Sequence, residues 1–137
     1  MSQENVEAIR RAFDAVDRGD LDAVAAELAP EFEYVATGDV VGIEGAYHGV
    51  QGFRQFLEWF WAEFDEPNVE IRRLIDAGDE VLTWVTFRGQ GTQSGVATSL
   101  DLWHVWTLRD GRAVRGRAFR SREEALDAAG LQGLPDG

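Results

Sequence analysis

Apolar residues near the start of the chain recur at the spacing of an amphipathic helix. They stand three, four and three residues apart, which predicts a helix that ends near Arg18. The residues of this stripe are Val6, Ile9, Phe13 and Val16. Asp20 is a favourable N-cap residue, and it predicts a second, shorter helix that Pro30 ends. The chain is therefore expected to begin with a helical hairpin.

A third helix is predicted from about residue 50 to residue 64. Its apolar face is heavily aromatic, and the Asp65-Glu66-Pro67 sequence is expected to end it. This face consists of Phe53, Phe56, Leu57, Phe60 and Phe64. Between the second and third helices, residues 31–36 alternate acidic and apolar side chains, which predicts a short strand. The glycine-rich residues 37–49 predict a loop that contains a small strand.

After Pro67 the apolar residues alternate with a period of two. The pattern predicts strands over residues 69–75, 81–88, 99–109 and 112–120, followed by a short helix that Ser121 caps. Helices followed by an antiparallel meander indicate an α+β fold, in which a bent sheet wraps around N-terminal helices. We expect one domain over residues 1–131 and a disordered tail over residues 132–137.

The strand over residues 99–111 places a histidine within an apolar sequence. Side chains alternate between the two faces of a strand, so His104 shares a face with Leu102 and Trp106. Asp101 stands three positions from His104 and points to the other face, so it is not a partner for the imidazole. A histidine in an apolar interior is a candidate for proton transfer near neutral pH, or else a packed core residue that a tyrosine satisfies.

The register of the last hairpin decides which side chains face His104. A two-residue Asp110-Gly111 turn would stack Arg115 and Arg117 on the apolar face, at a high desolvation cost. We therefore predict a three-residue loop with Gly111 in the left-handed conformation. In this register Trp106 faces Val114, His104 faces Gly116 and Leu102 faces Ala118. It leaves open space above the imidazole.

Composition and charge narrow the range of partners. The chain has 13 basic and 25 acidic residues and a net charge of -12, which disfavours binding to nucleic acid or to an anionic membrane surface. There is no cysteine, and the two histidines, His48 and His104, show no metal-ligand spacing, so we expect neither a metal nor a cofactor. The chain lacks a basic, apolar leader and a long apolar run, which favours a cytoplasmic location.

Four segments of the chain carry a resemblance to a known family. They read Phe-Asp-Ala-Val-Asp-Arg-Gly-Asp-Leu-Asp-Ala from residue 13, Ala-Pro-Glu-Phe-Glu-Tyr from residue 29, Tyr-His-Gly-Val-Gln-Gly-Phe-Arg-Gln-Phe from residue 47 and His-Val-Trp-Thr-Leu-Arg-Asp-Gly-Arg from residue 104. Over roughly residues 3–130 the chain resembles the SnoaL-like, ketosteroid-isomerase-like branch of the nuclear transport factor 2-like superfamily. The resemblance implies a cystatin-like cone with an apolar pocket. It also implies a homodimer through the outer face of the sheet, which would bury Trp103, Val105 and Phe119.

The residues that perform catalysis in this superfamily are replaced here. The tyrosine of the ketosteroid isomerases falls at Ala12, their base at Ala36 or Tyr34, and their donor aspartate at His104. The acid-base aspartate of the polyketide cyclases falls at Ala118. The family therefore implies a pocket for a small molecule without implying one reaction.

We predict that the protein binds a small apolar or aromatic, ring-containing molecule in the cone. Cofactor-independent isomerase or cyclase chemistry would use His104 as acid or base and Tyr34 as hydrogen-bond donor. The alternative is a non-catalytic ligand-binding or dimerisation module. The predicted ligand-binding residues are Trp106, Leu102, Trp84, Phe56, Phe60 and Arg120. His48 lies where the family places the pocket mouth, and we expect its side chain to be exposed.

Overall fold

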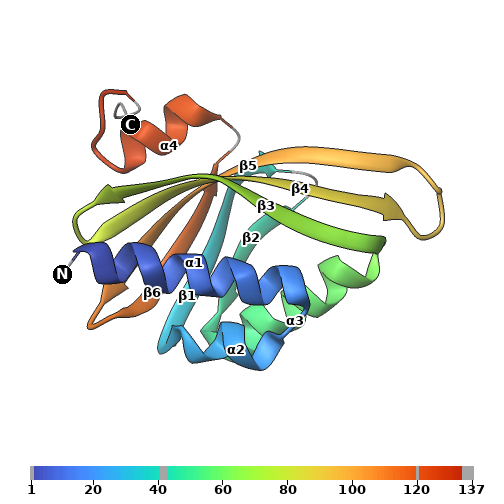
Figure 1. Ribbon diagram of the computed structural model, residues 1–137, viewed down its shortest axis with the longest axis horizontal. Helices are drawn as coiled ribbons and strands as arrows, with labels where there is room; N and C mark the ends of the chain where they lie inside the picture. Colours follow the sequence, from blue (N-terminus) through green and yellow to red (C-terminus); the bar gives the residue numbers. More distant parts are fainter. Residues whose placement is uncertain (1, 41–42, 120, 134–137) are drawn as a thin grey trace.

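A bent six-stranded sheet with three helices on one face and one on the other forms the protein (Figure 1). The computed structural model describes residues 2–40, 43–119 and 121–133, and the side chains of residues 3–36, 46–119 and 121–133. Its elements are α1 (Ser2–Arg18), α2 (Leu21–Ala26), β1 (Leu28–Val40), β2 (Ile43–His48), α3 (Gly49–Ala62), β3 (Phe64–Ala77), β4 (Glu80–Gly91), β5 (Ala97–Arg109), β6 (Arg112–Phe119) and α4 (Arg122–Ala128). The α+β cone is confirmed. Four residues of the predicted tail, 134–137, lie outside the described residues.

The sheet is mixed rather than purely antiparallel. Its strand order is β2-β1-β6-β5-β4-β3, and β1 pairs in parallel with β6 while all other neighbours are antiparallel. The predicted hairpins between consecutive strands are present. The parallel pair joins segments about eighty residues apart, and no turn sequence announces such a long-range contact.

Two strands begin earlier than predicted, because each takes a proline into an irregular part of its ladder. Pro30 lies in β1, where the pairing with β6 shifts register between Leu28 and Glu33. Pro67 lies in β3, where the pairing with β4 shifts between Asp65 and Asn68. A proline cannot donate a ladder hydrogen bond, so these breaks in regular pairing accommodate it.

The two faces of the sheet carry separate apolar clusters. The inner face packs on α1, α2 and α3, as the periodicity of those helices predicts. The outer face carries a smaller cluster that α4 covers with Ala125 and Leu126. Trp103, Val105 and Phe119 belong to this outer cluster and are buried within the single chain.

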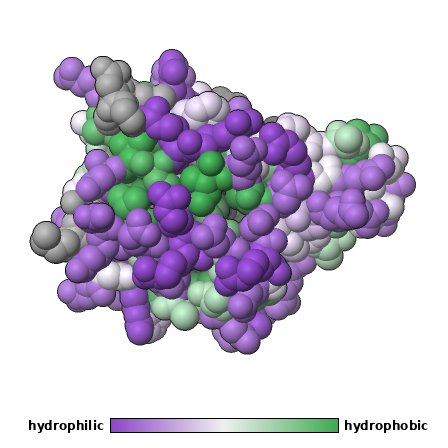
Figure 2. Space-filling view, in the orientation of Figure 1, coloured by the Kyte–Doolittle hydropathy of each residue, from purple (hydrophilic) through white to green (hydrophobic). Residues whose placement is uncertain are grey.

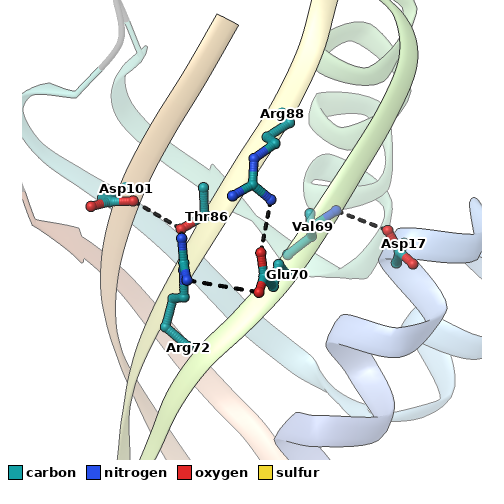
Figure 3. A network of polar contacts seen from close by, with 7 residues as sticks. All are labelled: Asp17, Val69, Glu70, Arg72, Thr86, Arg88 and Asp101. Atoms are coloured by element: carbon teal, nitrogen blue, oxygen red, sulfur yellow. Dashed lines mark hydrogen bonds and ion pairs between the residues drawn. The ribbon is translucent and has the colours of Figure 1, made fainter.

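Polar side chains surround the outer cluster and cross-link β3, β4 and β5 (Figure 3). Arg72 Nε donates to Thr86 Oγ1 at 2.9 Å, and Thr86 Oγ1 donates to Asp101 Oδ1 at 2.9 Å. On β3 and β4 as well, Arg88 Nη1 lies 2.8 Å from Glu70 Oε1. Hydrogen bonds and ion pairs therefore connect the strands of the outer face where α4 does not cover it.

The last hairpin has a two-residue turn, Asp110-Gly111, in place of the predicted three-residue loop, so the predicted register is wrong. Asp110 and Gly111 both have positive φ, at 54° and 78°. The expected cost of inward-facing arginines does not arise, because the pairing shifts by one residue at Val114. Consequently Arg115 and Arg117 face outward. The actual pairs are Trp106 with Gly116 and His104 with Ala118.

Gly116 provides space for Trp106 and not for a ligand above His104. A Cβ atom on Gly116 would lie 2.3 Å from Cζ3 and 2.6 Å from Cε3 of Trp106. The indole therefore lies directly against the glycine backbone. Its Nε1 donates to Thr83 Oγ1 at 3.0 Å, which holds the ring in this orientation.

We predict that Gly116→Ala destabilises the protein by about 2 kcal/mol, because the added methyl group displaces the buried indole. Gly52→Ala is the matched control, since its Cβ would meet only the Tyr47 carbonyl carbon at 3.7 Å, an ordinary contact. Alanine in α3 should be neutral or stabilising by up to about 1 kcal/mol. Urea unfolding measures both free energies. Equal stabilities of the two variants would contradict the packing of Trp106 on Gly116.

A homodimer through the outer face stays a prediction, and α4 changes its terms. Trp103, Val105 and Phe119 already lie under α4, so a partner would have to contact the surface beside this helix. Figure 2 shows apolar side chains at the surface between α4 and α1. Sedimentation velocity at micromolar concentration should give a dimer, and a monomer throughout that range would refute the prediction.

Candidate functional site

The inner face of the sheet and the three N-terminal helices enclose an apolar cavity of about 90 Å3. Six of the predicted site residues line it: Tyr34, Phe56, Phe60, Leu102, His104 and Trp106. The cavity is also lined by residues that were not predicted to bind a ligand, including Phe13, Phe53, Val85 and Phe87. Ala12 also lines the cavity, at the position where the ketosteroid isomerases are expected to carry a tyrosine.

Two predicted ligand-binding residues do not join this group. Trp84 lies on the outer face, where its ring stacks on Trp103 with centroids 5.1 Å apart. The strand around Trp84 has apolar residues on both faces, so alternation alone does not assign the Trp84 side chain to the inner or the outer face. However, Glu80 and Arg88 each stand four residues from Trp84, so their side chains share its face of the strand. Two charged residues on that face indicate that it is the outer one. Arg120 lies outside the described residues.

Tyr34 and His104 form a buried hydrogen-bonded pair at the polar end of the cavity. The Tyr34 hydroxyl lies 3.0 Å from His104 Nε2, and both residues are less than a tenth exposed. β1 supplies the tyrosine and β5 supplies the histidine, and β6 lies between these strands. The imidazole stacks on Trp106 with centroids 5.0 Å apart and an interplanar angle of 25°. The phenol ring packs between Phe53 and Phe56.

Burial holds both members of the pair in their neutral forms. Desolvation lowers the pKa of His104 from 6.5 to about 3, since burial disfavours the charged imidazolium. Desolvation likewise raises the pKa of Tyr34 far above its ordinary value. At neutral pH the pair is therefore an uncharged imidazole beside an uncharged phenol.

The pair leaves one hydrogen-bond donor free in either tautomer. His104 Nδ1 is buried and has no partner within the described part of the chain. When Tyr34 donates to Nε2, the proton of the imidazole resides on Nδ1. When Nε2 donates to the tyrosine oxygen, the phenolic proton is free instead. An unpaired buried donor costs about 1–3 kcal/mol, and a ligand oxygen would recover this energy.

Glu27 is the one carboxylate among the described residues that line the cavity. It follows α2 directly, and its Oε2 and Oε1 accept from Arg11 Nε and Nη2, each at 3.0 Å. No sequence pattern predicts this ion pair, because Arg11 lies on the polar side of α1 and Glu27 follows a different helix. No three His, Asp or Glu side chains lie together as metal ligands within residues 3–36, 46–119 and 121–133. The helices described there include none that is both long and apolar enough to span a membrane.

His48 lies outside the cavity, at the end of β2. Its side chain is 75% exposed, as predicted, and Nδ1 lies 3.0 Å from Glu33 Oε2 on β1. Together with Trp59 it borders a separate surface groove.

The lowered pKa of His104 predicts loss of stability in mild acid. The unfolded chain protonates this imidazole below pH 6.5 while the folded protein does not, so its stabilising contribution is complete above pH 6.5 and falls progressively toward pH 3. Between pH 7.5 and 5.5 the wild-type protein should lose about 1.4 kcal/mol more than His104→Gln, as measured by urea unfolding. An identical pH dependence for both proteins would show that His104 is not held neutral.

Comparisons with known proteins agree with this geometry. The chain shares 25% identity with a nuclear transport factor 2-like protein of unknown function from Burkholderia pseudomallei, covering 90% of this chain and 95% of that one at a TM-score of 0.76. TerC, co-crystallised with polyporic acid, shares 24% identity over 93% of this chain and 98% of its own, at a TM-score of 0.76.

A candidate SnoaL-like polyketide cyclase from Jannaschia shares 21% identity over 97% of this chain and 94% of its own, also at a TM-score of 0.76. No curated protein sequence matches the chain. The family model of the SnoaL-like domain matches residues 9–116, a segment that contains the second half of α1, the dyad of Tyr34 and His104, and most of the sheet. The chain therefore belongs to the SnoaL-like family of the nuclear transport factor 2-like superfamily.

Proposed function

We propose that the protein binds a small, flat, apolar molecule with a carbonyl group in the cone. The observation that carries this proposal is the buried Nδ1 of His104, which has no partner among the described residues and belongs to a residue that lines the apolar cavity. Apolar surface supplies most of the affinity in such a site, and a few polar groups set the orientation of the ligand. A carbonyl oxygen fits the dyad, because an acceptor satisfies the free donor of either tautomer.

We further propose that the dyad polarises this carbonyl in cofactor-independent cyclase or isomerase chemistry. The shifted pKa values disfavour any step through an imidazolium or a free phenolate. A neutral relay avoids both charges. In an aldol cyclisation, Nδ1–H gives its proton to the carbonyl oxygen as the new carbon–carbon bond forms. Tyr34 gives its proton to Nε2 and takes one from the attacking enol, so the proton count balances and the imidazole changes tautomer.

A non-catalytic ligand carrier is the second candidate function. The low basicity of His104 favours it, since an imidazole with a pKa of about 3 is a weak base at neutral pH. Alanines at positions 12 and 118 also favour it, because these positions correspond to catalytic residues in relatives. Both candidates share the binding step and differ in whether the dyad moves a proton.

The binding proposal is tested with 2-tetralone and tetralin, which share one bicyclic skeleton and differ in the carbonyl. Replacing both dyad members, in Tyr34→Phe/His104→Leu, removes the donors without orphaning either partner. The variant should bind 2-tetralone about threefold to tenfold more weakly than wild type and bind tetralin equally well or better, by isothermal titration calorimetry. Equal losses for both compounds, or no binding of either to wild type, would refute the proposal.

The catalytic proposal is tested by deuterium exchange at the α-carbons of 2-tetralone, followed by NMR in D2O. Polarisation of the carbonyl favours enolisation, so the wild-type protein should accelerate exchange above the buffer rate. The Tyr34→Phe/His104→Leu variant should lose this acceleration. Binding without acceleration would establish the carrier instead.

A further inference from the structure

A second concavity lies beside the cone cavity, on the surface between β2 and α3. Its volume is about 410 Å3, and its walls combine polar and apolar groups. It is lined by Tyr47, His48, Gly52, Gln55, Phe56 and Trp59. Phe56 lines both concavities, so this one side chain forms a wall between them.

Trp59 presents an indole to solvent in this groove. Its neighbours on α3, Phe56 and Phe60, are buried, whereas Trp59 is 54% exposed. Its ring lies 6.3 Å from that of Phe56, which gives the indole a fixed support. An exposed tryptophan has a large apolar face that folding leaves uncovered, on which another ring can stack.

Polar groups line the same groove as this indole. His48 and Glu33 are directly paired residues of β2 and β1, and the 3.0 Å contact between Nδ1 and Oε2 orients the imidazole. Nε2 of His48 has no hydrogen-bond partner within the described residues, so it can pair with a ligand. The exposed amide of Gln55 has no hydrogen-bond partner within the described residues and adds both a donor and an acceptor.

We infer that this groove binds a hydroxylated ring, such as a sugar, carried as a substituent by the molecule in the cone. The C–H face of such a ring stacks on an exposed indole, while the hydroxyl groups at its edge pair with imidazole and amide groups. An anionic substituent is disfavoured by Glu33 and by the net charge of -12. This inference rests on the proposed function, because it extends the ligand outward from the dyad.

The order of the aromatic rings sets the layout of such a ligand. The Phe56 ring lies 5.4 Å from that of Tyr34 on the cone side and 4.7 Å from that of Tyr47 on the groove side. The carbonyl site and the groove are therefore separated by a single aromatic layer. A ligand that occupies both concavities therefore requires the Phe56 side chain to turn aside. The ligand then has its carbonyl at one end and its hydroxylated ring at the other.

The test uses 4-methylumbelliferone and its 7-O-β-D-glucoside, which carry the lactone carbonyl and the sugar at opposite ends of a flat bicycle. Calorimetric titration of the wild-type protein should show the glucoside binding about tenfold more tightly than the aglycone. Trp59→Ala should abolish this gain and leave aglycone affinity unchanged. Trp59→Phe, which keeps an aromatic face, should retain part of it. Because Trp59 is exposed, both variants are expected to fold.

Distinct results separate this inference from the proposed function. If the aglycone binds and the glucoside binds no better, the groove assignment is overturned and the cone proposal stands. The same conclusion follows if Trp59→Ala weakens both compounds equally, or if choline displaces the glucoside from the groove as an organic cation would. If neither compound binds and 2-tetralone also fails to bind, the cone proposal itself is overturned and the inference falls with it.

Discussion

The contact between the Trp106 indole and the Gly116 backbone is the constraint on which the cone depends. Any side chain at position 116 would occupy the space of the indole. With the glycine there, the ring lies flat against β6, bonds to Thr83 on β4 and stacks on His104. The imidazole is thereby held within reach of Tyr34. One missing Cβ atom thus sets the floor of the cavity and the position of its polar groups.

Burial gives the dyad its chemical character. A histidine ordinarily titrates near neutrality, yet His104 is packed against the rings of Phe13 and Trp106, and desolvation by this burial lowers its pKa. What remains is a pair of neutral groups with one unsatisfied donor, which suits carbonyl recognition better than classical acid-base catalysis. The resemblance places an aspartate of the ketosteroid isomerases at position 104 and an aspartate of the polyketide cyclases at position 118, where this chain carries His104 and Ala118. The proposed function consequently depends on hydrogen bonding in an apolar cavity.

The outer face serves stability by a different balance of forces. Its centre is apolar and is covered by α4 of the same chain, while its margins hold ion pairs such as Arg117 with Glu80, at 2.8 Å. Because this acidic protein carries only 13 basic residues, arginines that bridge strands are effective in relieving repulsion among carboxylates. The concavities for which we propose ligands are the cone cavity and the adjoining groove at Trp59.

The sequence by itself determined the local features of this protein. Helical and strand periodicity predicted the elements and placed His104 with Leu102 and Trp106 on the inner face, because such periodicity is a property of neighbouring residues. Tertiary structure decided the partners of those residues. The parallel pairing of β1 with β6 joins distant segments of the chain. The one-residue shift at Val114 lies within the last hairpin, where the turn sequence does not announce it, and a shift of a single residue exchanges every facing pair along a strand. For that reason Ala118, and not Gly116, came to lie opposite His104.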